Sequence, residues 1–399
     1  MARNELRADE GFGRRAIYED EHENFREAVR RFVAREVLPE VEGWDREGIV
    51  PQEWYERAGE LGFVGMAIPE RYGGAEVEDF RFNAVLSEEF HRAGATGFGL
   101  ALCNHTDVCI PYLLAYTTEE QKQRWLPGAA DGSEIVAIAM TEPGTGSDLA
   151  AIATRARPDG GDWIVNGSKT FISVGHRSKR FVTAVRTDPD QPHRGLSLIV
   201  LDEDMPGFKR GRKLEKIGQH GIDTSELFFE DVRVPAENVL GEVGRGFDYL
   251  VSNLPQERMS IAVHGQAMAR GALVEAVDYA HERRAFGQPI AGFQATRFAL
   301  AQTYAEVEVS QAYLDQCLGQ LVAGTLTPED AAIAKLWATE TQGKVVDQCL
   351  QLFGGYGFMR EYGVARRFVD SRVSRIYGGT SEIMKEIVGK ALRPSRPPS

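Results

Sequence analysis

Cysteine is scarce in this chain of 399 residues. The four that occur, Cys103, Cys109, Cys317 and Cys349, form no CxxC pair and no spacing with histidine that is typical of a metal site. At this density, reduced thiols in a core are favoured over disulfides, and reduced thiols are typical of the cell interior. We therefore predict a cytoplasmic protein without a metal.

A basic surface and a long apolar stretch are also missing. The net charge is −13 and no long basic run occurs, which argues against nucleic acid or an anionic membrane as the main partner. No apolar stretch reaches the length that a bilayer requires, so we predict no membrane span. The first residues are acidic (Glu5, Asp9, Glu10), which is not the pattern of an organelle transit peptide.

The composition is that of a globular protein, and the hydrophobic pattern divides the chain into three stretches. With 43% hydrophobic and 26% charged residues, it is long enough for two or three domains. The apolar period is helical in residues 1–133, becomes two in residues 134–241, and is helical again in residues 242–399. The sequence thus predicts a multi-domain α+β fold: an N-terminal α-helical domain, a middle antiparallel β-barrel domain and a C-terminal domain like a four-helix bundle.

Helix signals mark the two outer stretches. Apolar residues recur with helical spacing from Phe25 to Val37, and this helix is expected to stop at Pro39. The run Thr117-Thr118-Glu119-Glu120 predicts a capped helix start. A Pro-rich tail, Pro394–Ser399, is expected to be disordered. Long helices of the last stretch are predicted over Phe247–Arg284, Gln294–Ala323 and Pro328–Leu352.

Strand signals mark the middle stretch. The apolar run Ile135–Met140 predicts a strand that ends in a turn. The dipeptide Asn166-Gly167, between Trp163–Val165 and Lys169–Ile172, predicts a β-hairpin turn. Further strands are predicted over Phe181–Val185, Leu196–Leu201 and Glu226–Val234.

A glycine-rich turn follows the first predicted strand. The run Thr141-Glu142-Pro143-Gly144-Thr145-Gly146-Ser147-Asp148 exposes N–H groups and hydroxyls that can hold a flat ring edge and a phosphate. A purely structural turn is the alternative. The run is not a Rossmann fingerprint, because the spacing and the following βαβ unit are missing.

Three further motifs can serve a cofactor. Phe171 could stack on a ring beside Ser173, although a core Phe with a solvated Ser is the ordinary interpretation. Arg283, followed by Phe286 and Gln294, suits a diphosphate, but an Arg at a helix end also complements the helix dipole. The helix end Gln351–Gly357 has glycines that permit close approach of a ligand or a second subunit.

One carboxylate stands out against a loop that has none. Glu257 lies in Leu254-Pro255-Gln256-Glu257-Arg258, whereas the loop Tyr377-Gly378-Gly379-Thr380 carries glycines. Taken alone, an acid just after a proline indicates a helix start and a capping residue. A catalytic carboxylate is the second interpretation.

In this order and in this α–β–α outline, the motifs resemble the acyl-CoA dehydrogenase family over roughly residues 19–392, and most closely its long-chain type. The resemblance implies the acyl-CoA dehydrogenase fold, one FAD per subunit and a homotetramer, in which Arg283, Phe286, Gln294, Gln351 and Gly355 reach the FAD of a neighbouring subunit. The other FAD contacts that it implies are Ile138, Met140, Thr141, Gly146, Ser147, Phe171, Ser173, Thr380 and Glu382. The substrate contacts that it implies are Ser147, Gln256, Arg258, Gly378 and Gly379.

The resemblance also implies the chemistry. Many members carry their catalytic base at the position of Gly378, whereas long-chain and isovaleryl-type members use the helix position of Glu257. Glu257 would take the α-proton of a saturated acyl-CoA thioester while the β-hydride passes to flavin N5, which gives a trans-2-enoyl-CoA. In the family the thioester carbonyl is held by the backbone N–H of the base residue and a ribityl hydroxyl, and electrons leave through an electron-transferring flavoprotein.

Two alternatives stay open at this point. The same fold hosts acyl-CoA oxidases and flavin-dependent monooxygenases, and the monooxygenases generally lack a carboxylate at both base positions. A non-catalytic, flavin-holding scaffold is the other alternative, as in some DNA-associated relatives. The net charge of −13 argues against a DNA-associated scaffold. The presence of Glu257 argues against a monooxygenase.

Overall fold

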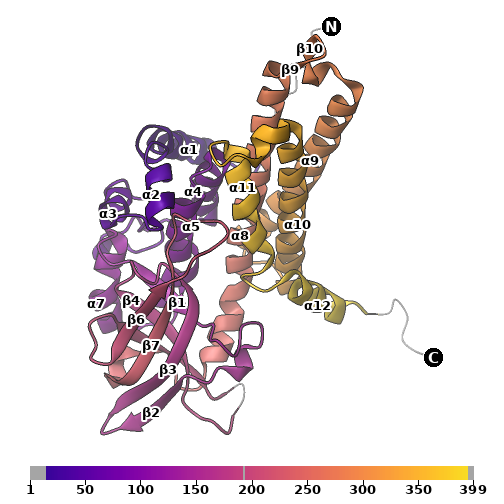
Figure 1. Cartoon of the computed structure of the whole chain (residues 1–399). Helices are drawn as coiled ribbons and strands as arrows, with labels where there is room; N and C mark the ends of the chain where they lie inside the picture. Colours follow the sequence, from indigo (N-terminus) through magenta and orange to yellow (C-terminus); the bar gives the residue numbers. More distant parts are fainter. Residues whose placement is uncertain (1–14, 192–193, 394–399) are drawn as a thin grey trace, which may run out of the picture.

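A computed structural model describes residues 15–191 and 194–393 of the chain. Its helices and strands come in three successive groups, helical, β and helical (Figure 1), which confirms the predicted fold class. The expected disorder of residues 394–399 and the acidic residues Glu5, Asp9 and Glu10 lie outside the described residues. None of the helices in the described ranges combines the length and the apolarity that crossing a membrane takes.

The first group packs short helices around aromatic side chains. The apolar stripe from Phe25 to Val37 faces this core, with Val29 and Val37 fully buried, and the helix ends as predicted before Pro39. Thr118 accepts a hydrogen bond from the backbone of Gln121, so the predicted cap is confirmed. The elements are α1 (Asp20–Phe32), the π-helix η1 (Val33–Val37), α2 (Val41–Glu47), α3 (Gln52–Glu60), η2 (Glu70–Tyr72), α4 (Phe80–Ala93), α5 (Thr96–Cys103), the π-helix η3 (Asn104–Cys109), α6 (Ile110–Ala115) and α7 (Glu119–Ala130).

The middle group is a single twisted sheet with the order β6-β7-β3-β2-β4-β5-β8, and β1 pairs with β4. The prediction of a wholly antiparallel sheet is wrong. The sheet is mixed, because β1 runs parallel to β4 after the chain has crossed over through β2 and β3. The elements are β1 (Val136–Ala139), η4 (Leu149–Ala151), β2 (Arg155–Asp159), β3 (Asp162–Ser173), β4 (Arg180–Arg186), β5 (Leu196–Asp202), β6 (Phe208–Lys213), β7 (Thr224–Val234), η5 (Ala236–Asn238) and β8 (Val239–Leu240).

The hairpin predicted at Asn166-Gly167 is wrong. The chain turns at Gly160-Gly161, whose positive φ angles of 61° and 98° suit a two-residue hairpin, and β3 then runs on through Asn166. The Asn166 side chain exchanges hydrogen bonds of 2.9 and 3.0 Å with Asp231 on β7, next to a shift in register. Glycine is needed at position 167 because a Cβ there would lie 2.6 Å from Thr154 Oγ1. Asn-Gly therefore makes a bulge here instead of reversing the chain.

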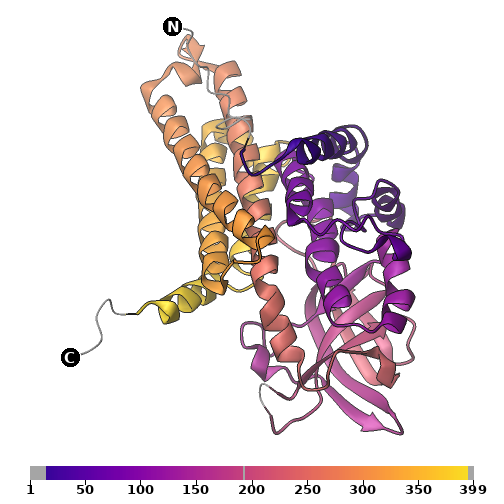
Figure 2. The same cartoon turned by 180° about the vertical axis from the view of Figure 1, so that it is seen from behind.

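The last group is built on α8, and the three long helices are confirmed within two residues at each end. With 37 residues α8 is about 55 Å long, and it runs from the β group past the N-terminal helices to the tip that carries β9 and β10 (Figures 1 and 2). The elements are α8 (Gly246–Glu282), β9 (Arg284–Ala285), β10 (Gln288–Pro289), η6 (Ile290–Gly292), α9 (Gln294–Val322), α10 (Pro328–Phe353), η7 (Gly354–Phe358), α11 (Gly363–Ser371), η8 (Arg372–Arg375) and α12 (Ser381–Ala391).

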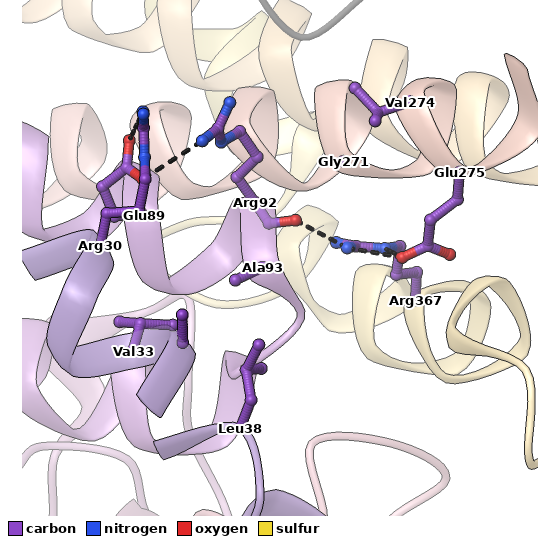
Figure 3. Close-up of a pocket in the computed structure, with 11 residues that line it drawn as sticks. Arg30, Val33, Leu38, Glu89, Arg92, Ala93, Gly271, Val274, Glu275 and Arg367 are labelled. Carbon is purple, nitrogen blue, oxygen red and sulfur yellow. Dashed lines mark hydrogen bonds and ion pairs between the residues drawn. The ribbon is translucent and has the colours of Figure 1, made fainter. Parts of the chain in front are cut away.

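A buried arginine joins the N-terminal helices to the C-terminal bundle. Arg367 of α11 donates to the carbonyl oxygens of His91 (2.9 Å) and Arg92 (2.7 Å) and pairs with Glu275 of α8 (Figure 3). Beside it lies a hollow of about 330 Å³, where Arg30 pairs with Glu89 in the same way. Because the arginines of this hollow already have carboxylate or carbonyl partners, it is a seam between the two helical groups and not the candidate active site.

Candidate active site

Glu257 lies in the interior of α8, eleven residues after the first residue of that helix. The interpretation as a capping acid at a helix start is therefore wrong, because α8 begins at Gly246 and Pro255 lies inside it. The Glu257 side chain is only 5% exposed, and its Oε1 accepts a hydrogen bond of 2.8 Å from the Tyr112 hydroxyl of α6. A buried carboxylate with a single neutral donor is electrostatically unfavourable, and carboxyl groups in such surroundings cluster at functional sites.

Burial raises the pKa of Glu257 from 4.5 to about 7, and the Tyr112 hydrogen bond and the charge of Arg258 oppose this rise without cancelling it. A carboxyl group with this pKa is half ionised near neutral pH. It can therefore both accept and release a proton under physiological conditions, which is what a general base requires.

The residues on either side of Glu257 face different surroundings. Gln256 donates from its side chain to the carbonyl oxygen of Asp107 on η3, at 2.9 Å. Arg258 is buried, and its Nε has no hydrogen-bond partner among the described residues. Burial lowers the pKa of Arg258, and the charge of Glu257 partly offsets the effect.

The glycine loop lies against α8 one turn after Glu257. Gly378 and Gly379 have φ angles of 63° and 93°, and a Cβ at Gly378 would lie 2.2 Å from Cδ1 of Ile261. Lys335 of α10 donates to the carbonyl oxygen of Gly379 at 2.7 Å, so α10 holds the loop in place. At Gly378 and Gly379 the loop therefore presents only backbone toward Ile261, one turn of α8 after Glu257.

The end of β1 forms a second part of the site. Ile138 lies on β1, and Met140 and Thr141 follow it, with the Thr141 carbonyl accepting from the Thr170 backbone at 2.9 Å. Beneath them Lys169 is fully buried and donates to Met140 O (3.0 Å) and to Glu142 (2.8 Å). Desolvation lowers the pKa of Lys169 to about 8, although Glu142 opposes this shift.

The turn after β1 is held open by Glu142, which accepts hydrogen bonds from the backbone N–H groups of Ala153 (2.8 Å) and Thr154 (2.9 Å). Gly146 and Ser147 are exposed in this turn. The Glu142 carboxylate thus satisfies two backbone N–H groups of the segment that follows the turn. Gly146 and Ser147 stay accessible to a ligand.

Phe171 fits a flat cofactor. Its side chain is 67% exposed and its φ angle is 59°, a backbone conformation that costs energy for a residue with a Cβ. It lies on β3 at a shift in register, two residues before the half-buried Ser173. The interpretation of Phe171 as a core residue is wrong, and an apolar ring held exposed beside a hydroxyl and the end of β1 suits a planar ring system.

The remaining cofactor candidates lie elsewhere. Thr380 caps the first turn of α12, accepting from Ile383 N, and Glu382 is exposed in that turn. At the far tip of the bundle, away from the β group (Figures 1 and 2), an open hollow of about 490 Å³ includes Arg283 with Tyr356, whose ring lies 5.5 Å from the guanidinium. The predicted residues at this tip are Arg283, Phe286, Gln294, Gln351 and Gly355, and Phe286 is 97% exposed. Within one chain they do not meet the end of β1.

Comparison with known proteins decides the family. The acyl-CoA dehydrogenase N-terminal, middle and C-terminal domain models match residues 19–133, 137–232 and 244–393. The chain belongs to the acyl-CoA dehydrogenase family. It is 43% identical to the mitochondrial long-chain specific acyl-CoA dehydrogenase of Sus scrofa, over 95% of this chain and 88% of that protein.

Solved acyl-CoA dehydrogenases have the same fold. The enzyme from Geobacillus kaustophilus is 44% identical, with a TM-score of 0.90 over 94% of this chain and 98% of that one. A glutaryl-CoA dehydrogenase from Mycobacterium smegmatis in complex with FADH2 is 28% identical, with a TM-score of 0.90 over 97% and 98% of the two chains. The chain is therefore an FAD-dependent oxidoreductase that acts on an acyl-CoA.

Sequence reasoning missed several residues of the candidate active site. Tyr112 lies in the apolar run Ile110–Leu114 and has the spacing of a core residue, so nothing local distinguishes it. Lys335 and Lys169 look like surface lysines until the fold buries them. A lysine within a run of small apolar residues, as in Ala331–Ala334 before Lys335, was the one available signal.

Proposed function

We propose that Glu257 is the base that removes the α-proton of a saturated acyl-CoA, so that the product is the trans-2-enoyl-CoA. The observation that carries the proposal is the buried, Tyr112-bonded carboxyl group whose pKa is raised to about 7. The loop position used by other members cannot replace it, because position 378 is a glycine packed against Ile261. When bound, FAD supplies the acceptor for the β-hydride.

The thioester carbonyl needs a donor other than the backbone of Glu257. Glu257 lies inside an α-helix, where its N–H donates to the carbonyl four residues before it. We assign the role to a backbone N–H of the loop Gly378–Gly379, whose carbonyl side is already held by Lys335. Donors fixed before the substrate arrives stabilise an enolate-like oxygen without reorganisation. Gln256, Arg258 and Ser147 remain our candidates for further substrate contacts.

We propose a homotetramer in which each flavin touches two subunits. Arg283, Phe286 and Gln294 are exposed at the tip of the bundle, and Gln351 and Gly355 line the hollow there. Phe286 (97% exposed), Phe298 and Phe358 are exposed on the elements that meet at this tip, and several exposed apolar side chains together indicate a surface that another molecule covers. We further propose that electrons from the reduced flavin pass to an electron-transferring flavoprotein, as the resemblance to the family implies.

Anaerobic titration of the purified holoenzyme tests the proposal. Butyryl-, octanoyl-, dodecanoyl-, palmitoyl- and isovaleryl-CoA would be added separately while the flavin absorbance is followed. Loss of the oxidised flavin band with at least one of them, and recovery of the 2-enoyl-CoA as product, is the expected result. The same enzyme reoxidised slowly by oxygen but rapidly by an electron-transferring flavoprotein would exclude an oxidase. If no saturated acyl-CoA bleaches the flavin, the proposed reaction is wrong.

A further inference from the structure

Tyr112 and Glu257 meet from different helical groups. They are 145 residues apart in the sequence, Tyr112 on α6 of the N-terminal helices and Glu257 on α8 of the bundle. The Tyr112 side chain is fully buried, and its hydroxyl lies 2.8 Å from Glu257 Oε1. Among residues 15–191 and 194–393, it is the one hydrogen-bond donor to this carboxyl group.

The structure fixes Tyr112 at this position through contacts on both sides of the base. Asp107 of η3, one turn before α6, receives hydrogen bonds from two residues of α8: Gln256 reaches its carbonyl oxygen at 2.9 Å and Ser260 its carboxylate at 2.5 Å. These residues flank Glu257 along the helix. The segment η3 is a π-helix, whose wider turn changes the face that the following helix presents, and such segments are frequent at functional sites.

The other titratable groups around Glu257 do not serve as donors to it. The Cys109 thiol of η3 is buried, and burial together with the charge of Glu257 raises its pKa, so it stays a neutral thiol. Arg258 follows Glu257 on α8 and acts on it through its charge. Burial, reinforced by Glu257, also raises the pKa of Tyr112 well above its usual range, so the phenol keeps its proton and donates it.

We infer that Tyr112 is a positioning residue for the reaction: its hydroxyl holds the Glu257 carboxylate in one orientation and stabilises the ionised form that accepts the α-proton. The inference rests on the proposed role of Glu257 as the base. A hydrogen bond to a charged carboxylate favours that form over the neutral acid. Without this hydrogen bond, Glu257 would stay buried but lose the larger of the two interactions that oppose the effect of burial on its pKa.

The test compares Tyr112→Phe with the matched control Tyr116→Phe in FAD-loaded enzyme. The Tyr116 hydroxyl also forms a hydrogen bond to α8, but its partner there is Ser252 Oγ, at 2.6 Å, and not Glu257. Flavin reduction by a saturating acyl-CoA would be followed anaerobically by stopped flow between pH 6 and pH 9. Loss of one hydrogen bond to a charged group should raise the apparent pKa of reduction by about one unit.

The expected result is a pH-dependent defect. With the base pKa moved from about 7 to about 8, the ionised fraction at pH 7 falls from one half to about one eleventh, so reduction slows about fivefold there and recovers almost completely at pH 9. Tyr116→Phe should superimpose on the wild type. If Tyr112→Phe fails to hold FAD, Tyr112→Gln and Tyr112→Met are compared instead. Glutamine can still donate a hydrogen bond to Glu257 and methionine cannot, so Tyr112→Gln should have the lower apparent pKa of reduction.

A wild-type pH profile in Tyr112→Phe, or a rate loss that is equal at every pH, would overturn the inference, because either result assigns Tyr112 a packing role. Glu257→Gln, measured in parallel, separates this failure from that of the proposed function. If Glu257→Gln still reduces its flavin at the wild-type rate, the base assignment fails whatever Tyr112 does. If Glu257→Gln is inactive while the Tyr112→Phe profile is unmoved, only the role of Tyr112 is wrong.

Discussion

Replacing Glu257 by glutamine should separate catalysis from stability more sharply than any other single change in this enzyme. The amide keeps the size of the side chain and one acceptor oxygen for Tyr112, but it cannot take a proton. Removal of a general base typically slows a reaction by about 10² to 10⁴. We expect at least this loss in flavin reduction by an acyl-CoA, because the α-proton of a thioester is very weakly acidic, whereas binding of FAD and acyl-CoA should remain.

The same substitution should lower the rate of flavin reduction but raise the stability of the folded protein near neutral pH. The folded-state pKa of Glu257, about 7, lies roughly 2.5 units above the ordinary value of 4.5, which corresponds to about 3 kcal/mol. Because the folded state binds this proton more tightly than the unfolded state, the free energy of unfolding falls as the pH rises from about 4.5 to 7. Glutamine does not ionise and escapes this loss. The stability of Glu257→Gln relative to the wild type should therefore rise between pH 5 and pH 8, by up to about 3 kcal/mol.

Stopped-flow flavin reduction and chemical denaturation at pH 5 and pH 8 measure the two effects. Asp248→Asn is the matched control, because Asp248 is an exposed carboxylate in the first turn of the same helix, paired only with Arg245 at 2.7 Å among the described residues. The control should change neither the reduction rate nor the pH dependence of stability by much. Two results would refute the reasoning: wild-type reduction in Glu257→Gln, or a stability difference that does not change between the two pH values.

Further substitutions test the loop, the flavin contacts and the buried ion pair. A carboxylate placed at Gly378 in the Glu257→Gln background should restore flavin reduction only when Ile261 is also changed to Ala, because the new Cβ would lie 2.2 Å from the Ile261 side chain; equal rescue without the second change would contradict this packing. Arg283→Glu should lower the FAD content of the purified protein, measured by absorbance, and unchanged occupancy would leave Arg283 with only a role at the helix end. Lys169→Met should destabilise the enzyme by roughly 3 kcal/mol in denaturation, since it leaves the buried Glu142 carboxylate without its counter-charge, and an unchanged stability would contradict this.

The long helices and most strands could be predicted because their signals are local. The helices that contain the stripe from Phe25 to Val37 and the stretch Pro328–Leu352 follow from apolar spacing alone, and the structure has helices at both places. The hairpin prediction at Asn166-Gly167 was wrong because the Asn166 side chain forms a hydrogen bond to Asp231 on the neighbouring strand. The chain reverses direction at Gly160-Gly161 instead. Turn propensity is a local preference that a cross-strand contact can override.

The sequence by itself determined the family, the three-part outline and the absence of a carboxylate at position 378. It also singled out Glu257, but it could not separate a base from a cap, because both interpretations ask only for an acid near a proline. Tertiary structure excluded the cap, because it places Glu257 in the interior of α8 and buries its carboxyl group. The same holds for Tyr112, which reads as one more apolar position in its helix. Its role depends on a hydrogen bond to a residue 145 positions away, and only packing of α6 against α8 brings the two atoms to 2.8 Å.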